Sequence, residues 1–167
     1  MEILKELVDL ARLSPSGSNR QSLKFVLSAG EHNEKIFSCL SWAGHLPEWK
    51  HPEEGERPAA YIVILNDKEL GNVTVDINTG IAATGILLGA VERGLGGCMF
   101  GAVNKGKLAE LLSLPENLEI ILVIALGKPK ETVVLTDIKD GDIKYYRDEN
   151  QVHYVPKRKL DEIIHFI

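Results

Sequence analysis

The feature that most constrains the fold of this chain is a long segment near its middle, residues 75–93, which is apolar on nearly every side. Ile77, Ile81, Ile86 and Leu88 leave it no continuous polar face. A helix of this kind is buried instead of lying on a surface. Small residues recur along it, at Gly80, Ala82, Ala83, Gly85, Gly89 and Ala90. Because small residues allow another helix to approach closely, the segment predicts a central helix in a large interface, such as one between subunits.

Helical and strand patterns alternate on both sides of this segment. Helical spacing predicts helices over residues 2–13, 34–42, 105–112 and 160–166. Apolar and β-branched runs bounded by turn residues predict strands over 24–29, 60–66, 97–102 and 118–126, with a short strand around 143–146. The spacing is too irregular for a doubly wound sheet. It predicts instead an α+β fold, a mixed central sheet flanked by helices, in a single domain over residues 1–167.

A proline-rich stretch, HLPEWKHPEEGERP at residues 45–58, separates two of these elements. Connections of this length are usually lids or binding loops. The region Trp42–Trp49 therefore has two interpretations: a cover over a ligand, or aromatic packing in the core.

Bulk properties argue against several classes of protein. The formal net charge of −5 argues against a nucleic-acid partner, which would call for a basic face. No apolar stretch approaches the roughly 18 residues of a membrane span, so we expect no membrane partner. Residues 1–13 lack the continuous apolar core of a signal peptide, and Cys39 and Cys98 form no CxxC pair, so we expect a cytoplasmic protein. The histidine spacing matches no zinc pattern, so we expect no metal.

Three polar or glycine-rich stretches are candidates for a ligand site. Residues 14–22 read SPSGSNRQS and are either a plain turn or a binding loop. Residues 93–97 read RGLGG, where Gly94 suits a helix C-cap, while Gly96 and Gly97 would let the backbone approach a flat ligand. This stretch closes a helix, so it is not a dinucleotide fingerprint.

The third stretch is PKRK at residues 156–159, the densest positive cluster in the chain. It is either a solvated patch or an anion site, in which arginine supplies a bidentate fork for phosphate. The N-terminus of the predicted helix that follows would add backbone donors.

Four stretches in order resemble the nitroreductase family of flavin mononucleotide (FMN) enzymes. ARLSPSGSNRQSLKF, residues 11–25, resembles that family's Ala-Arg, Pro-Ser and Asn-x-Gln pattern before a strand. Residues 76–101 resemble its central dimer helix and glycine turn. LVIALGKPKE, residues 122–131, is similar to its late strand ending in Gly-x-Pro, and VPKRKLDEIIH, residues 155–165, to its basic C-terminal element.

The resemblance implies a nitroreductase-like fold and a homodimer with FMN at the subunit interface. Pro15, Ser16, Asn19 and Gln21 match positions that contact the flavin ring from one subunit. Gly96 and Gly97 match the turn of the other subunit, whose backbone N–H faces flavin N5; we expect Gly97 to donate there as the catalytic contact. Lys157 and Arg158 match the basic residues that approach the phosphate.

The activity implied is that of an oxidoreductase that passes a hydride from NAD(P)H through flavin N5 to a small-molecule acceptor by a ping-pong mechanism. The resemblance implies nitroaromatics, quinones or free flavins as acceptors. Other flavin chemistry, such as dehalogenation, is an alternative activity.

Several departures support an alternative, a degenerate flavin-binding or structural homodimer without turnover. Ser22 and Leu23 stand where the family usually has Pro and Trp, and Thr84 where Asn or Gln is common. Family members also usually begin earlier, with an Arg-rich segment that grips the phosphate, so we expect FMN to bind this chain more weakly than is usual in the family.

Overall fold

A four-stranded antiparallel sheet organises the larger part of the chain in a computed structural model that describes residues 1–167. Its strands are β1 (Leu23–Ala29), β2 (Ala60–Asp67), β3 (Gly96–Phe100) and β4 (Leu118–Gly127), in the order β1-β2-β4-β3. Each neighbouring pair is antiparallel, and β3 forms one edge. All four strands predicted for this part of the chain are therefore confirmed, but the mixed pairing expected here is not found in this sheet.

The sheet belongs to one of two compact units. Unit 1 comprises Met1–Ser41 and Glu54–Lys128, and unit 2 comprises Trp42–Glu53 and Pro129–Ile167. Each unit contains two separate stretches of chain, so the boundaries are not simple linkers between consecutive segments. Part of the 45–58 loop thus belongs to unit 2.

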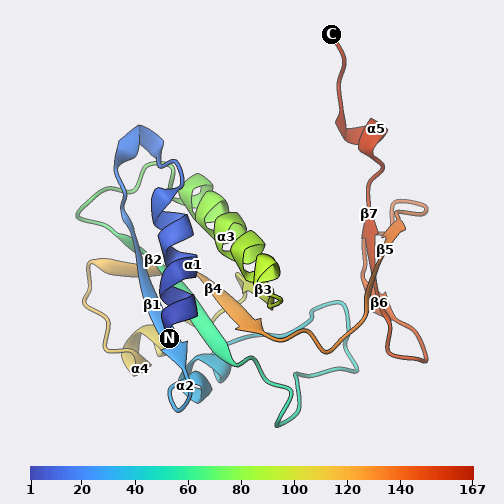
Figure 1. Cartoon of the computed structure of the whole chain (residues 1–167), viewed down its shortest axis with the longest axis horizontal. Coiled ribbons are helices and arrows are strands. Elements are labelled where there is room, and N and C mark those ends of the chain that lie inside the picture. The colour runs from blue at the N-terminus through green and yellow to red at the C-terminus, as the bar shows by residue number, and fades with distance from the viewer. The chain divides into compact units, whose positions relative to one another are not determined.

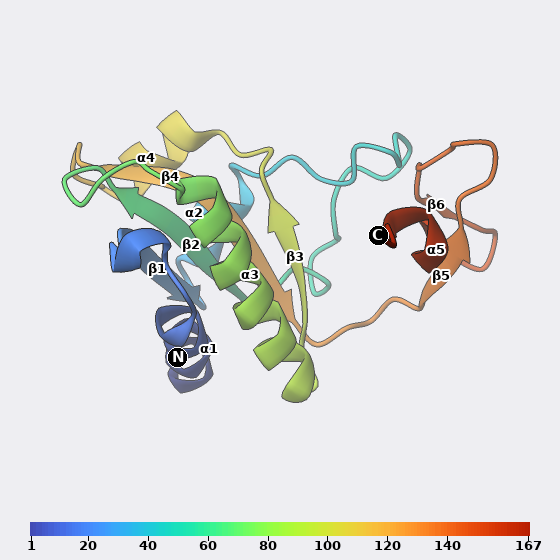
Figure 2. The ribbon, with the colours of Figure 1, turned by 90° about the horizontal axis from the view of Figure 1, so that it is seen from above.

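Helices cover both faces of the sheet in unit 1. On one face lie α1 (Glu2–Leu13) and α3 (Val75–Glu92), and on the other lie α2 (Asn33–Phe37) and α4 (Lys105–Leu111) (Figures 1 and 2). Successive residues of β2 are buried because its two faces are both covered. The main core lies between the sheet and α1 and α3, and its buried residues are Leu4, Leu7, Ala11, Ile62, Ile64, Ala82, Ala83, Ile86, Ala90, Ile124 and Leu126.

The close approach predicted for the central helix is confirmed, and α1 of the same chain makes it. A Cβ on Gly89 would overlap Leu10 Cδ1 and lie 3.1 Å from Leu7 Cδ2, and one on Gly85 would lie 3.4 Å from Ser14 Oγ. Arg93, just after α3, forms an ion pair with Glu6 of α1 at 3.0 Å. Glycine at 89 therefore allows the two helices to pack closely within one subunit.

The central helix has the length and composition of a membrane span, contrary to the expectation that no stretch comes near it. All 18 residues of α3 fall in a window with mean hydropathy 1.2, and 39% of that window is buried. Core helices of globular proteins meet the same two criteria. Because α3 packs on α1 and the sheet, these values reflect its place in the core of unit 1.

Unit 2 contains a small three-stranded sheet that the sequence did not predict as such. Its strands are β5 (Val133–Asp137), β6 (Tyr146–Arg147) and β7 (His153–Lys157), in the order β5-β7-β6. β5 and β7 run parallel, whereas β6 and β7 run antiparallel, so mixed pairing occurs here. The strand expected around 143–146 is displaced to β6.

Two predicted helices are shorter than expected. The helix expected over 34–42 ends at Phe37, because the chain then turns and Leu40 forms a β-bridge with Val103. The helix expected over 160–166 is a single turn, α5 (Leu160–Ile163). A helix this short lacks the aligned backbone donors that we expected beside the basic cluster.

Candidate functional site

The loop between α1 and β1 has an unusual backbone. Ser18, Asn19 and Gln21 all lie in the left-handed region, with φ of 51°, 53° and 52°. For residues other than glycine this conformation costs about 1–3 kcal/mol each and is concentrated at functional sites. A short 3-10 turn, η1 (Gly17–Asn19), shapes the loop. We refer to residues Pro15–Gln21 as the Pro15–Gln21 loop.

Hydrogen bonds within the loop hold most of this shape. The Gln21 N–H donates to Ser16 Oγ at 3.0 Å, and the Gln21 side-chain amide donates to both the carbonyl and the side-chain oxygen of Asn19, each at 3.2 Å. The Asn19 N–H donates to the Ser16 carbonyl at 2.8 Å. The loop is thus folded on itself, with the amide groups of Asn19 and Gln21 exposed at its tip.

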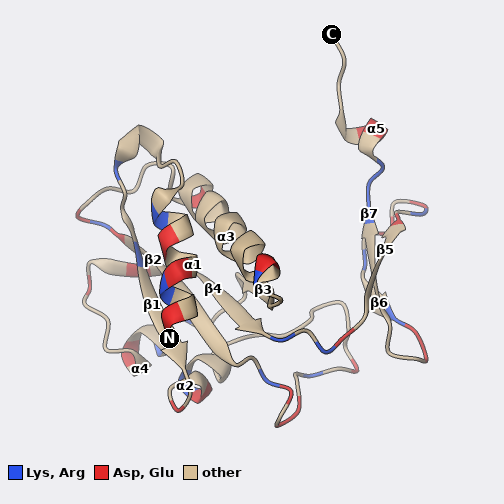
Figure 3. Ribbon diagram, in the orientation of Figure 1, with Lys and Arg blue, Asp and Glu red and all other residues tan.

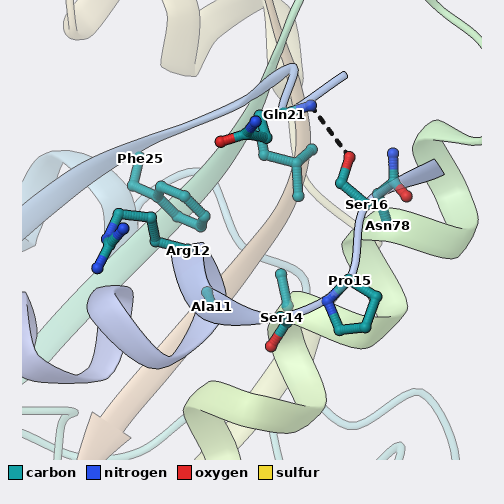
Figure 4. Close-up of a pocket in the computed structure, with 10 residues that line it drawn as sticks. Ala11, Arg12, Ser14, Pro15, Ser16, Gln21, Phe25 and Asn78 are labelled. Carbon is teal, nitrogen blue, oxygen red and sulfur yellow. Dashed lines mark hydrogen bonds between the residues drawn. The ribbon is translucent and has the colours of Figure 1, made fainter. Parts of the chain in front are cut away.

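A cavity of about 150 Å³ lies beside this loop, bounded by α1, β1 and α3 (Figure 4). Its lining combines apolar side chains with hydroxyl, amide and guanidinium groups, from Ala11, Arg12, Ser14, Pro15, Ser16, Gln21, Leu23, Phe25, Asn78 and Ala82. Sites for small molecules usually measure about 300–1,000 Å³. This cavity is therefore large enough for only part of a cofactor-sized ligand.

The cavity brings together three of the predicted site residues, Pro15, Ser16 and Gln21. Asn19 is in the same loop but not in the lining. Gly96 and Gly97 lie at the start of β3 and do not line the cavity either.

The structure gives Gly97 a packing role. A Cβ at this position would lie 2.5 Å from Leu87 Cδ2, 2.9 Å from Leu126 Cδ2 and 3.1 Å from the Ala125 carbonyl oxygen. Glycine is therefore required where β3 meets α3 and β4, whether or not a ligand approaches the strand. Because β3 is an edge strand, part of its backbone polar groups face away from β4.

Lys157 and Arg158 lie in unit 2, where β7 ends, and both are exposed. The adjacent Lys159 lies 3.9 Å from an Asp137 carboxylate oxygen. Lys157 and Arg158 have no such acidic partner, so their charges are available to an anion.

The Trp42–Trp49 region packs within unit 2. The two indole rings lie 6.1 Å apart at 80°, and the Arg147 guanidinium lies 4.8 Å from the centre of the Trp49 ring. Arg147 also forms an ion pair with Glu131 at 2.9 Å. A second cavity, of about 280 Å³, opens beside these groups and is lined by His45, Leu46, Pro47, Glu48, Trp49, Tyr146, Arg147, Asp148 and Gln151.

Sequence reasoning missed two residues of the site, Asn78 and Thr74. Asn78 is only 3% exposed and accepts a hydrogen bond from the Gly17 N–H at 2.9 Å. A Cβ on Gly17 would overlap Thr74 Oγ1. The available signal was a carboxamide side chain in an otherwise apolar helix.

Two residues that depart from the family pattern, Ser22 and Thr84, make ordinary hydrogen bonds within the fold. Ser22 is buried, and its carbonyl accepts a hydrogen bond from the Asp67 N–H at 2.8 Å, next to the end of the pairing between β1 and β2. Thr84 is on the exposed side of α3, and its hydroxyl donates to the Gly80 carbonyl at 2.9 Å. No group of three or more His, Cys, Asp or Glu side chains is placed to hold a metal ion.

Two sets of exposed polar groups, one in each unit, suit different parts of a flavin nucleotide. Carboxamides both donate and accept hydrogen bonds, as the pyrimidine edge of a flavin ring does, and Asn19 and Gln21 carry exposed carboxamides. The Lys157 ammonium and the Arg158 guanidinium suit a phosphate group.

Comparison with known proteins identifies the family of this chain. The family model described as the nitroreductase family matches residues 1–128, ending where unit 1 ends. An Archaeoglobus fulgidus protein, provisionally named an NADH dehydrogenase/NAD(P)H nitroreductase, is 28% identical in an alignment 155 positions long, which covers 88% of this chain and 82% of the relative. A Caenorhabditis elegans iodotyrosine dehalogenase 1 homolog is 26% identical over 87% of this chain, which spans about half (53%) of that relative's length.

Among solved structures, an FMN-dependent nitroreductase from Clostridium difficile has the same fold, with a TM-score of 0.62 and 22% identity. The match covers 99% of this chain and 86% of that one. The predicted fold is thereby confirmed. The match to the family model over most of the chain shows that this protein belongs to the nitroreductase family, whose members are typically flavin-dependent oxidoreductases.

Proposed function

We propose that this protein is an FMN-dependent oxidoreductase that takes electrons from NAD(P)H and passes them to a nitroaromatic, quinone or similar acceptor. The observation that carries the proposal is the Pro15–Gln21 loop, strained, polar-tipped and set beside a cavity, in a chain of this family. When bound, FMN would supply the redox chemistry itself.

The chain's own residues would bind and orient this cofactor. Asn19 and Gln21 would bind the pyrimidine edge through their carboxamides, while Pro15 and Ser16 form the wall beneath the ring. Gly96 and Gly97 would contribute backbone, with the Gly97 N–H as a donor where negative charge develops. Lys157 and Arg158 would bind the phosphate.

We also propose a homodimer, in which a second copy completes each site. The exposed side of α3 carries Ile77, Leu88 and Val91, each more than 60% exposed, and the neighbouring β3 carries exposed Met99. Charged residues on α3 lie only at its ends (Figure 3). An apolar surface of this kind is typical of an interface, and the small size of the cavity calls for a second wall. We also propose a cytoplasmic setting, since Cys39 and Cys98 are not joined in a disulfide.

FMN titration followed by steady-state kinetics tests the proposal. We expect FMN to bind in a ratio of one per chain, and we expect parallel double-reciprocal plots when NADH or NADPH and a nitroaromatic or quinone are varied together. A halogenated tyrosine belongs in the acceptor panel, because one relative is named as a dehalogenase. FMN that binds but supports no turnover with any acceptor would favour the non-catalytic alternative that the departures at Ser22, Leu23 and Thr84 suggest.

A further inference from the structure

One buried side chain fastens the Pro15–Gln21 loop to the core helix. The Gly17 N–H donates to Asn78 Oδ1 at 2.9 Å, and this is the one hydrogen bond that joins residues 15–21 to the rest of unit 1. The other bonds of the loop are internal. Asn78 is 3% exposed, so this bond is shielded from competing water.

Thr74 holds the Asn78 carboxamide in place from the opposite side. The Asn78 Nδ2 group donates to Thr74 Oγ1 at 3.4 Å, and the Thr74 hydroxyl donates to the Val73 carbonyl at 2.6 Å. Thr74 Oγ1 also lies where a side chain on residue 17 would be, so the Gly17 backbone packs directly against it. Gly17, Thr74 and Asn78 therefore form a small clamp between the loop and the first turn of α3.

The loop needs such a clamp because its conformation is unfavourable. Three of its residues other than glycine lie in the left-handed region, and an untethered loop would relax from this shape. A binding loop already held in its bound shape gains affinity, since less conformational freedom is lost when the ligand binds. Asn78 also lines the cavity (Figure 4), so the clamp and the ligand-facing surface share a side chain.

We propose that Asn78 is the positioning residue that holds the Pro15–Gln21 loop ready to bind a flavin. The inference rests on the proposed function for the identity of the ligand, but the clamp itself can be tested without one. Asn33 provides a control, because it is a half-buried asparagine of unit 1 that donates to the Ala59 carbonyl at 2.8 Å and accepts from Ser28 Oγ at 2.8 Å, without a hydrogen bond to the loop.

The first arm of the test measures hydrogen–deuterium exchange in FMN-free protein. Asn78→Ala is expected to speed exchange in a peptide covering residues 14–22, whereas Asn33→Ala, although also destabilising, leaves exchange there unchanged. Asn78→Asp keeps an acceptor for the Gly17 N–H and is expected to restore slow exchange. Equal exchange of this peptide in wild type and Asn78→Ala would overturn the clamp.

The second arm measures FMN affinity by titration. Asn78→Ala is expected to raise the FMN Kd about five- to tenfold, the effect of one lost hydrogen bond between neutral groups, and Asn78→Asp to reverse most of that change. Faster exchange with an unchanged Kd, or an equal rise in Kd for Asn33→Ala, would overturn the positioning role. A wild-type protein that binds no FMN would overturn the proposed function instead, and the exchange arm would still decide the clamp.

Discussion

At the scale of single residues, Tyr61 of β2 shows what a buried group without a partner costs. Its side chain is fully buried and its hydroxyl has no hydrogen-bond partner. Replacing such a group by an apolar one of the same shape is close to neutral or stabilising. We therefore expect Tyr61→Phe to leave the free energy of unfolding unchanged or raise it by up to about 1 kcal/mol at neutral pH, as measured by urea denaturation. A clear loss of stability would mean that the hydroxyl is bonded.

The same residue makes stability depend on alkaline pH. Burial raises the pKa of Tyr61 well above its ordinary value of 10.0; the Glu34 carboxylate raises it further and Arg57 opposes both. The folded state therefore keeps the phenol proton at pH values where the unfolded chain loses it. This group therefore leaves the free energy of unfolding unchanged with pH below about pH 10 and lowers it as the pH rises above that value toward the folded pKa. Wild type should lose stability more steeply than Tyr61→Phe above that pH, and parallel curves would contradict this.

Lys157 and Arg158 can be tested by comparing two ligands that differ only in a phosphate. A charge-assisted hydrogen bond contributes about 1.5–3 kcal/mol, so Lys157→Ala or Arg158→Ala should raise the FMN Kd about tenfold or more. The Kd for riboflavin, which has no phosphate, should not change. Lys139→Ala removes an equal charge elsewhere in unit 2 and serves as the control. Equal losses for FMN and riboflavin would mean that these residues do not bind the phosphate.

At the scale of elements, the contact between α1 and α3 depends on Gly89. Alanine favours a helix by about 1 kcal/mol over glycine, but its Cβ would overlap Leu10 in this contact. Overpacking costs about 1–3 kcal/mol, so we expect Gly89→Ala to lower the free energy of unfolding or leave it little changed. Gly106→Ala, in α4, meets open space and should stabilise by about 0.4–1 kcal/mol. Equal stabilisation by both substitutions would contradict the packing argument.

The helices and strands also show which parts of the fold can be predicted from the sequence. Long apolar runs such as Leu118–Gly127 and the all-round apolar α3 were predicted nearly to the residue, because burial on several sides leaves a strong pattern. β5 is largely exposed and pairs with a strand some 20 residues further along the chain, so neither its pattern nor its neighbours identify it. α2 ends early because a bridge from Leu40 to Val103 redirects the chain.

The candidate site likewise contains some residues that the sequence predicts and others whose roles only the structure shows. Turn residues and a family resemblance predict Pro15, Ser16, Asn19 and Gln21 as candidates, because their chemistry is local to one stretch, and the structure places three of them, Pro15, Ser16 and Gln21, at one cavity. The roles of Asn78 and Gly97 could not be read from the sequence, because they arise from contacts across the fold: with Gly17 in one case, and with Leu87 and Leu126 in the other.

At the scale of the whole molecule, the apolar side of α3 predicts association. Leu88 is 67% exposed on that side, so a charge there would oppose burial against a second copy. We expect wild type to elute as a dimer in size-exclusion chromatography with light scattering, and Leu88→Glu to shift it to monomer and weaken FMN binding. Leu70→Glu, at an exposed leucine outside α3, should remain dimeric. A monomeric wild type that binds FMN would contradict the two-copy site.

The central claim is that this chain, once loaded with FMN, accepts electrons from a nicotinamide nucleotide. Anaerobic stopped-flow absorbance of the loaded protein, mixed separately with NADH and with NADPH, measures this step without any acceptor. The account predicts that the visible flavin absorbance bleaches with at least one donor and returns when a quinone or nitroaromatic is added. Flavin that stays bound and oxidised with both donors would contradict it.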